Sequence, residues 1–387
     1  MTPVVRETLR LKRGVRSLAQ TGHPWILADE IEPSEKPRND GQAVAYSSEG
    51  VMLGTGFFSA HSRIAWRRFR PDLGPLDEDW IDHALQSALA KRPCRISRRL
   101  FWSESDGIPG FVVDQYGQYL VVQITTQGVE SAWPEIQKSL LRLIQPKGIW
   151  VRRDAAGRKI EGLENLTGES VGVIPEDFVR VEIGGMVVPV DLRMGQKTGT
   201  YLDQQDNYSI VAEAAKGKRV LDLYCHNGGF ALRCAAAGAQ MVTGVDRSET
   251  SLRIAKLASL ENSLTIRWPQ EDAVRFLRSS RKGEYDLVIV DPPGLAKSRD
   301  SRAASLRFMA EIHRQAIRVL VRGGTLVSFS CSHRVGVEDL RGMIQTLAVE
   351  EKRGATFLRT LSQAADHPHL SSFPESQYLT GWMVELK

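Results

Sequence analysis

The sequence predicts an α/β protein. Its C-terminal half is expected to be a Rossmann-like, doubly wound parallel sheet, preceded by a β-rich module and a small α/β segment. Helix-like and strand-like segments alternate from about residue 203 to the end, which is typical of a parallel sheet covered by helices. Short strand-like runs bounded by glycines fill the first 72 residues. Between these regions, strand-like runs flank a single helix-like segment over residues 133–144.

Residues 218–246 begin the C-terminal sheet. An apolar strand at Val220–Leu223 leads to a glycine pair at 228–229, then to an apolar helix-like segment and a second strand that ends at Asp246. This order forms a right-handed βαβ unit. Glycine lets backbone N–H groups in the turn approach a ligand, and an acid that closes the second strand can hydrogen-bond ribose hydroxyls. The unit therefore predicts a nucleoside-cofactor site.

Two later strand ends indicate which cofactor binds. The first turn lacks the G-x-G-x-x-G pattern, which disfavours a nicotinamide oxidoreductase. One apolar strand runs into Asp291-Pro292-Pro293, and a later one into Ser330-Cys331-Ser332. This ordered set of strand-end motifs resembles the class I S-adenosylmethionine (SAM)-dependent methyltransferases. The resemblance implies SAM as the cofactor.

Bulk properties exclude several classes. The 387 residues suggest two or three domains, and 42% hydrophobic and 25% charged residues are ordinary for a globular protein. We expect a cytoplasmic protein, because the N-terminus lacks a secretory h-region and no apolar run reaches bilayer-spanning length. The four cysteines form no C-x-x-C pair, and His23, His226 and His333 lack metal-ligand spacing. No disulfide or metal is therefore expected.

The net charge of +5 mildly indicates an anionic partner. The segment 63–70 packs four arginines around two aromatic residues, and a second basic run spans 91–99. Basic and aromatic side chains together suit phosphate contacts and base stacking, although a solvated basic strand face is the plainer explanation. The candidate RNA-binding residues are Arg63, Trp66, Arg67, Arg68 and Arg70.

Taken as a whole, the chain resembles the bacterial large-subunit (23S) ribosomal RNA cytosine-C5 methyltransferases with an N-terminal PUA domain. The matching motifs are GHPW at 22–25, ESDGIPGFVVDQYG at 104–117, GQKTGTYLDQQDN at 195–207, GGF at 228–230, DPP at 291–293, SCSH at 330–333 and QAADHP at 363–368. The resemblance implies large-subunit ribosomal RNA as partner and leaves a homodimer open. It divides the chain into a PUA-like RNA-binding domain (1–72), a connecting helix (73–95), a small α/β middle domain (96–195) and a SAM-dependent methyltransferase domain (196–387).

The implied chemistry requires a reactive thiol. Cytosine C5 is a poor nucleophile until a thiolate adds to C6; the enamine-like ring then attacks the sulfonium methyl, and loss of H5 restores aromaticity. Cys331 follows a core strand, at the end where open α/β sheets bind ligands, and is the predicted nucleophile. An inert buried thiol is the alternative. Cys225 and Cys234 are interpreted as packing residues. Asp291 is expected to contact the cytosine amino group or handle a proton, or else only to cap its strand.

The resemblance also implies how the cofactor is held. Asp222 and Gly228 would frame the methionine portion and Asp246 the ribose, and Asp272 would meet the adenine amino group while capping a helix. A segment around Lys197 would lie over the cofactor. The complete predicted set is Lys197, Thr198, Gly199, Asp203, Gln204, Asp222, Tyr224, Asn227, Gly228, Gly229, Asp246, Asp272 and Asp291.

Two alternatives stay open at this point. The turn Tyr224–Asn227 departs from the Ser/Thr-Tyr-Thr-like residues usual in the family, so the chain could be an RNA-binding protein with an inactive methyltransferase domain. A different RNA acceptor atom is the second alternative. Exocyclic N-methylation typically uses an aromatic residue after the two prolines, and Gly294-Leu295 argues against it.

Overall fold

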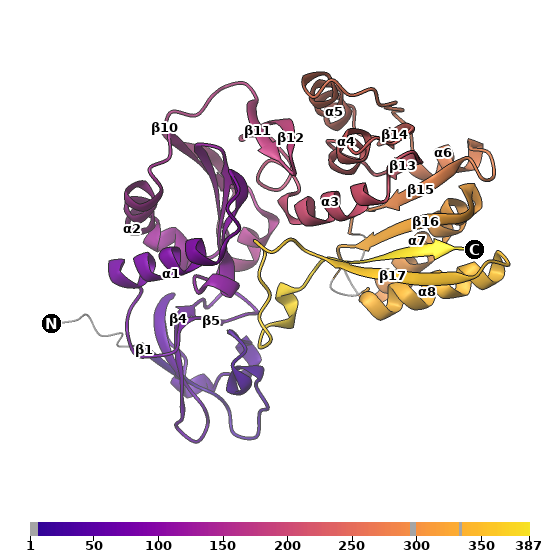
Figure 1. The fold of residues 1–387 in the computed structure, drawn as a ribbon. Coiled ribbons are helices and arrows are strands. Elements are labelled where there is room, and N and C mark those ends of the chain that lie inside the picture. The colour runs from indigo at the N-terminus through magenta and orange to yellow at the C-terminus, as the bar shows by residue number, and fades with distance from the viewer. Residues whose placement is uncertain (1–6, 295–298, 333–334) are drawn as a thin grey trace. The chain divides into compact units, whose positions relative to one another are not determined.

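The computed structural model describes residues 7–294, 299–332 and 335–387 (Figure 1). Leu295 and His333 lie outside the described residues. The chain forms two compact units. The first comprises Met1–Val179, Asp191–Gly199 and Asp366–Ser376, and the second comprises Arg180–Val190, Thr200–Ala365 and Gln377–Lys387. The four-part division expected from the sequence stays a prediction.

The first unit begins with a β-rich module. Its sheet has the order β1-β3-β4-β5-β2, with β1 parallel to β3 and the other pairs antiparallel. The strands are β1 (Glu7–Arg10), β2 (Trp25–Ile26), β3 (Gly41–Tyr46), β4 (Met52–Phe58) and β5 (Trp66–Arg70). Leu9, Ile26, Phe58 and Trp66 are buried in its core. The basic stretch therefore contributes a strand, as predicted.

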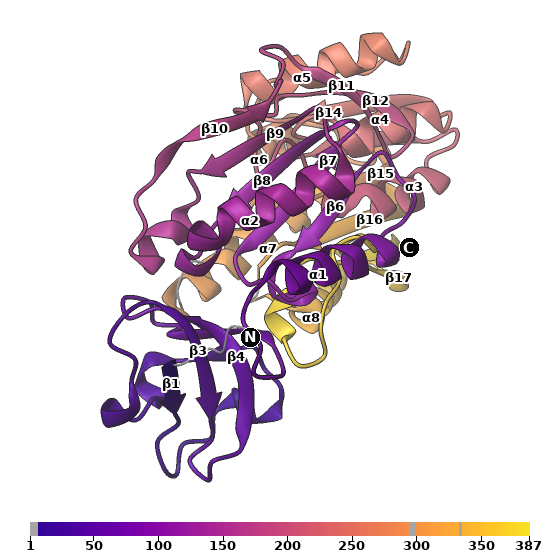
Figure 2. The same cartoon turned by 90° about the vertical axis from the view of Figure 1, so that its left-hand side faces the viewer.

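A second sheet in this unit has the order β10-β9-β8-β7-β6. Its strands are β6 (Ser97–Trp102), β7 (Phe111–Tyr116), β8 (Tyr119–Ile124), β9 (Gly148–Arg153) and β10 (Leu166–Gly172). Helices α1 (Glu78–Lys91) and α2 (Gln127–Ile144) lie side by side across one face (Figure 2). Helix α2 begins before the expected Trp133 and continues through the exposed Pro134, because Val129, Trp133 and Ile136 are buried along one side.

The second unit contains the sheet β14-β13-β15-β16-β18-β17 (Figure 1). Its strands are β13 (Arg219–Leu223), β14 (Met241–Val245), β15 (Tyr285–Val290), β16 (Leu320–Ser330), β17 (Ala355–Ser362) and β18 (Thr380–Leu386). The first four are parallel, and β18 runs antiparallel to both β16 and β17. Bridges Thr243–Arg267 and Asp246–Gln270 add a short parallel pairing beside β14. The predicted fold class is confirmed.

Helices and a hairpin surround this sheet. The helices are α3 (Gln205–Glu213), α4 (Gly229–Ala236), α5 (Glu249–Glu261), α6 (Ala273–Ser279), α7 (Arg299–Val319) and α8 (Val337–Glu350). Strands β11 (Val179–Ile183) and β12 (Met186–Val190) form the hairpin, and Asn262 bonds both backbone groups of Val187. Short 3₁₀ helices are Leu18–Thr21, Ala28–Glu30, Pro33–Glu35, Ser103–Asp106, Ala156–Glu161, Leu202–Gln204 and Pro374–Ser376. Among the described helices, none is long and apolar enough to cross a membrane.

Candidate active site

Three predicted side chains stand at the carboxyl ends of neighbouring parallel strands. Asp246, Asp291 and Cys331 directly follow β14, β15 and β16. Asp222 is the penultimate residue of β13, which pairs with both β14 and β15. Parallel strands end at the same edge of a sheet, so these groups gather there. The pKa of buried Asp222 reflects this, because burial raises it and the charges of Asp291 and Asp246 raise it further.

The turn after β13 is held in an uncommon backbone conformation. Tyr224 and His226 both have positive φ angles, of 61° and 49°. Asp246 fixes the turn, because its carboxylate accepts hydrogen bonds from the backbone N–H of His226 (2.9 Å) and of Ser248 (2.8 Å). The ring of Tyr201 meets His226 edge-on at 4.8 Å. A carboxylate oxygen can accept more than one hydrogen bond, so Asp246 retains capacity for a ribose hydroxyl.

Aromatic rings of the protein crowd the glycine pair. Gly228 has φ +81°, and a Cβ there would lie 2.4 Å from the Trp268 ring. A Cβ at Gly229 would lie 2.4 Å from Cζ of Tyr208. These glycines are therefore required by packing as well as by any close approach to a ligand. Neither Trp268 nor Tyr208 was predicted, because neither belongs to a local motif.

Buried hydrogen-bond acceptors face this turn. Asp222 is 1% exposed, and its Oδ2 accepts from the backbone N–H of Ala231 at 3.1 Å. Its Oδ1 and the Oδ1 of buried Asn227 have no hydrogen-bond partner among the described residues. Buried polar atoms normally have partners. A ligand with an ammonium or hydroxyl group would supply the missing donors, and SAM carries both, in its methionine portion and its ribose.

Asp291 is held by an amide of the Leu202–Gln204 helix. Nε2 of Gln204 donates to Oδ2 of Asp291 at 2.9 Å. Asn207 donates from Nδ2 both to Oε1 of Gln204 (2.6 Å) and to the carbonyl of Ser362 (2.9 Å). A carbonyl only accepts, so the Ser362 contact fixes the Asn207 amide, which in turn fixes that of Gln204. Asp291 is thus oriented by two side chains beyond its own strand.

Two hydrogen bonds hold Asp203 in place. The hydroxyl of Tyr378 donates to Oδ2 of Asp203 at 2.7 Å, and the backbone N–H of Ala364 donates to its carbonyl at 2.7 Å. The pKa of Tyr201 nearby is raised by burial and by the charges of Asp291 and Cys331, so its phenol stays protonated. Tyr378, far from Asp203 in the chain, was not predicted.

The cysteines differ in environment. Cys331 is half-buried at the end of β16, with Sγ 3.7 Å from the carbonyl oxygen of Pro292 and beside Gly294, where a Cβ would approach Sγ to 3.4 Å. A small cavity of about 10 Å³ adjoins it, between the Pro292–Gly294 loop and α7. Cys225 and Cys234 are buried, and burial raises the pKa of each thiol. These two side chains are packed within the unit, in agreement with their interpretation as packing residues.

Asp272 caps helix α6. Its Oδ1 accepts from the backbone N–H groups of Val274 and Arg275, each at 3.1 Å. Oδ2 lies 3.9 Å from Arg247 in an exposed ion pair. Asp272 therefore caps this helix as expected, and its Oδ2 is left at the surface.

Lys197, Thr198 and Gly199 belong to the first unit, whereas the other predicted cofactor residues belong to the second. Thr198 is 1% exposed and hydrogen-bonds the carboxylate of Asp114 and, at 3.2 Å, the hydroxyl of Tyr116. Asp114 also accepts two hydrogen bonds from Arg99, at 2.8 and 2.7 Å. A buried ion pair therefore anchors this segment.

The structure corrects the predicted RNA-binding set. Trp66 is fully buried and its Nε1 donates to the carbonyl of Ala43 at 2.9 Å, so the prediction that its ring contacts RNA was wrong. Its side chain packs in the core of this sheet with Leu9, Ile26 and Phe58. Arg67 bonds Glu161 (2.9 Å) and Glu104 (3.3 Å) internally. Arg63 is exposed, and Arg68 and Arg70 are half-buried.

Comparisons with known proteins agree with this geometry. Residues 157–371 match the family model described as S-adenosylmethionine-dependent methyltransferase, and residues 9–71 match the PUA-like domain. A relative from Aeromonas hydrophila named "Ribosomal RNA large subunit methyltransferase I" is 36% identical, covering 94% of this chain and 96% of its own length. A relative of the same name from Photobacterium profundum is 32% identical, with coverage of 98% and 99%.

Solved structures show the same fold. One, described as a candidate SAM-dependent methyltransferase from Streptococcus mutans, has a TM-score of 0.80 at 18% identity and covers 98% of this chain and 100% of its own. Another, described as a candidate methyltransferase in complex with SAH, has a TM-score of 0.83 at 19% identity, with the same coverage.

Proposed function

This chain belongs to the S-adenosylmethionine-dependent methyltransferase family, and we propose that it methylates C5 of a cytosine in large-subunit ribosomal RNA. The substrate class rests on the two named relatives, which match nearly the whole chain. The choice of C5 rests on one observation: the half-buried thiol of Cys331 lies at the carboxyl end of β16, against the loop that follows Asp291. A nucleophile is required at such a position, and buried Cys225 and Cys234 cannot reach a substrate.

The acceptor-rich strand ends fit the cofactor. SAM, when bound, supplies an electrophilic methyl group on a cationic sulfur. We infer that Asp222 and Asn227 face the methionine portion, because each has a buried oxygen with no partner among the described residues. Asp246 would hold the ribose, and Asp272 the adenine amino group. The remaining proposed cofactor residues are Lys197, Thr198, Gly199, Asp203, Gln204, Tyr224, Gly228, Gly229 and Asp291.

The proposed mechanism assigns a step to each catalytic residue. The Cys331 thiolate forms a bond to C6, and the electron pair of the C5–C6 double bond makes C5 nucleophilic toward the methyl group. Methyl transfer leaves the donor sulfur as a neutral thioether. A base then takes the proton from C5, the electrons of that C–H bond re-form the double bond, and the S–C6 bond breaks to return its electron pair to sulfur. Asp291, oriented by Gln204, accepts a hydrogen bond from the cytosine amino group and so positions the ring.

Transfer of label from SAM to unmodified large-subunit RNA tests this function. Wild type should produce labelled 5-methylcytidine, and Cys331→Ala should produce none. Cys94→Ala is the matched control, because Cys94 is an exposed thiol in the other unit and should leave the product unchanged. Equal label from Cys331→Ala would remove Cys331 from the mechanism. Label in an N-methylated base would show a different acceptor atom, and no label from wild type would exclude this substrate.

A further inference from the structure

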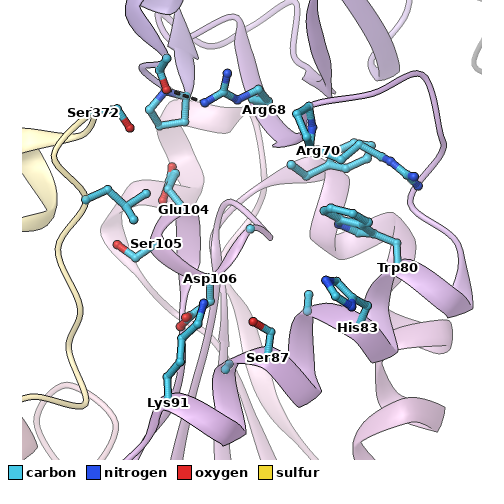
Figure 3. Close-up of a pocket in the computed structure, with 18 residues that line it drawn as sticks. Arg68, Arg70, Trp80, His83, Ser87, Lys91, Glu104, Ser105, Asp106 and Ser372 are labelled. Carbon is cyan, nitrogen blue, oxygen red and sulfur yellow. Dashed lines mark hydrogen bonds between the residues drawn. The ribbon is translucent and has the colours of Figure 1, made fainter.

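A pocket of about 380 Å³ lies within the first unit, between β5 and α1 (Figure 3). Arg68 stands at one end of the pocket and Lys91 at the other, with Trp80 and His83 along one side and Ser105 on the opposite side. None of these residues belongs to the strand ends that carry Cys331 and Asp291. Its volume falls within the range of pockets that bind small ligands.

Neither cation at its two ends forms a close ion pair with a described residue, although the charge of Lys91 acts on the carboxyl of Asp106, where it opposes the rise in pKa that burial causes. The Arg68 guanidinium donates only to backbone carbonyls, those of Gly22 (2.5 Å) and Leu53 (3.4 Å), and it forms no ion pair with any described residue. Burial lowers its pKa, since no carboxylate compensates the charge. Lys91 is exposed and likewise has no ion-pair partner within the described part of the chain. An anion between them would compensate both charges.

Two carboxylates also line the pocket, but each already accepts from an arginine. Glu104 accepts from Arg67 at 3.3 Å and from the Trp25 indole at 2.8 Å. Asp106 is paired with Arg92 in the interior. Arg68 forms no ion pair with a described carboxylate, and the carboxylate on which Lys91 acts is already bonded to Arg92, so the pocket suits an anionic ligand.

The side of the pocket formed by α1 is suited to a planar group. The guanidinium carbon of Arg70 lies 4.4 Å from the centre of the Trp80 ring, and the His83 ring lies 5.7 Å from that ring. Guanidinium and aromatic planes are the surfaces on which proteins stack single-stranded bases. Along α1, Trp80, Ser87 and Lys91 recur at helical spacing on the face that lines the pocket, and the small Ala84 and Ala88 between them leave room.

We propose that this pocket binds one unpaired nucleotide of the RNA substrate, with its two flanking phosphates at Arg68 and Lys91 and its base on the Trp80–His83 side. The inference rests on the proposed function for the identity of the ligand as RNA. An unpaired nucleotide is specified because a base inside a duplex is stacked on its neighbours and cannot enter a pocket.

The test measures binding of a labelled 12-nucleotide single-stranded RNA by fluorescence polarisation, alongside a duplex of the same length. Lys91→Glu reverses one charge, and Ser87→Phe fills the pocket. Each should weaken single-strand binding about tenfold. The matched controls are Lys138→Glu, at an exposed lysine of α2 in the same unit, and Gln86→Phe, at an exposed residue of α1 that does not line the pocket. The affinity of these controls for single-stranded RNA should stay within about threefold of wild type, and Ser87→Phe should leave the affinity for duplex RNA unchanged.

Several results would overturn the proposal. Wild-type affinity in both Lys91→Glu and Ser87→Phe would show that the pocket takes no RNA. Equal losses on duplex and single strand from Ser87→Phe would indicate a groove contact and no nucleotide pocket. These outcomes are separable from failure of the proposed function, because formation of 5-methylcytidine by wild type tests the reaction independently of the pocket. If wild type forms 5-methylcytidine but does not bind the single-stranded RNA, the pocket proposal alone fails.

Discussion

Gln204 donates a hydrogen bond of 2.9 Å from Nε2 to Oδ2 of Asp291. The two residues belong to different elements, since Gln204 ends a short 3₁₀ helix and Asp291 follows β15. Asn207 fixes the amide through its own bond to Gln204. Gln204 and Asn207 thus hold the Asp291 carboxylate in one orientation, as a ligand-binding group requires. A carboxylate that only capped a strand would not need this support.

Gln204→Glu should slow methyl transfer about tenfold or more at pH 7. The new carboxylate would lie beside Asp291, and two like charges raise the pKa of the pair. The rate should then recover as the pH rises, whereas Gln204→Leu should be slow without a shift of the profile. Single-turnover rates measured against pH separate the two variants. Profiles identical to wild type for both would contradict the role given to Asp291.

Asp222→Asn should weaken SAM binding without destabilising the protein. Burial raises the pKa of Asp222, so its ionised form lowers stability as the pH rises through that raised pKa. An amide carries no such charge, and the unliganded variant should melt at or above the wild-type temperature at pH 8. The increase in Tm produced by SAM should shrink. Exposed Asp177→Asn is the control. A full SAM-induced shift in Asp222→Asn would show that the carboxylate does not hold the cofactor.

His313 should make stability fall in mild acid. It is fully buried, with Nδ1 2.6 Å from the carbonyl of Met309 and Nε2 2.5 Å from the Ser328 hydroxyl, and burial lowers its pKa from 6.5 to about 4. Between these two values the unfolded chain binds more protons than the folded one. The contribution of His313 is therefore complete above pH 6.5 and falls as the pH drops toward 4, by about 3 kcal/mol in all.

Urea unfolding at several pH values measures this effect. His313→Gln should be less stable throughout but should lose this pH dependence, whereas exposed His61→Gln should keep the wild-type slope. A wild-type slope in His313→Gln would assign the acid sensitivity to other groups.

Two glycines in helices should respond oppositely to alanine. Gly229→Ala places a Cβ 2.4 Å from the Tyr208 ring, which should cost about 1–3 kcal/mol of unfolding free energy through overpacking. A Cβ at Gly342, inside α8, would meet no atom within 4 Å, so Gly342→Ala should stabilise by up to about 1 kcal/mol. Thermal or urea unfolding of both variants checks the signs. Equal changes in the free energy of unfolding for the two variants would mean that the Tyr208 ring moves aside without an energetic cost.

The strand ends could be predicted because their signals are local. Apolar runs marked β13 to β16, and parallel pairing then placed Asp246, Asp291 and Cys331 at one edge. The interpretation of Cys331 as a candidate nucleophile and of Cys225 and Cys234 as packing residues followed from their positions relative to these strands.

Contacts between distant segments could not be predicted. The hydroxyl of Tyr378 bonds Asp203 across 175 residues, and the Trp268 ring occupies the space that a side chain at Gly228 would need. No spacing rule links such pairs. The prediction for Trp66 was wrong for a related reason: its basic neighbours suggested exposure, whereas its ring packs against residues distant in the chain, such as Leu9 and Ile26.

Covalent trapping tests the central claim most directly. Large-subunit RNA containing 5-fluorocytidine would be incubated with enzyme and SAM and analysed on a denaturing gel. Fluorine at C5 cannot leave as a proton does, so after methyl transfer the bond between Cys331 and C6 should persist. Wild type and Cys94→Ala should form a protein–RNA adduct that survives denaturation, and Cys331→Ala should form none. An adduct with Cys331→Ala, or methylated RNA without any adduct in wild type, would contradict nucleophilic catalysis by Cys331.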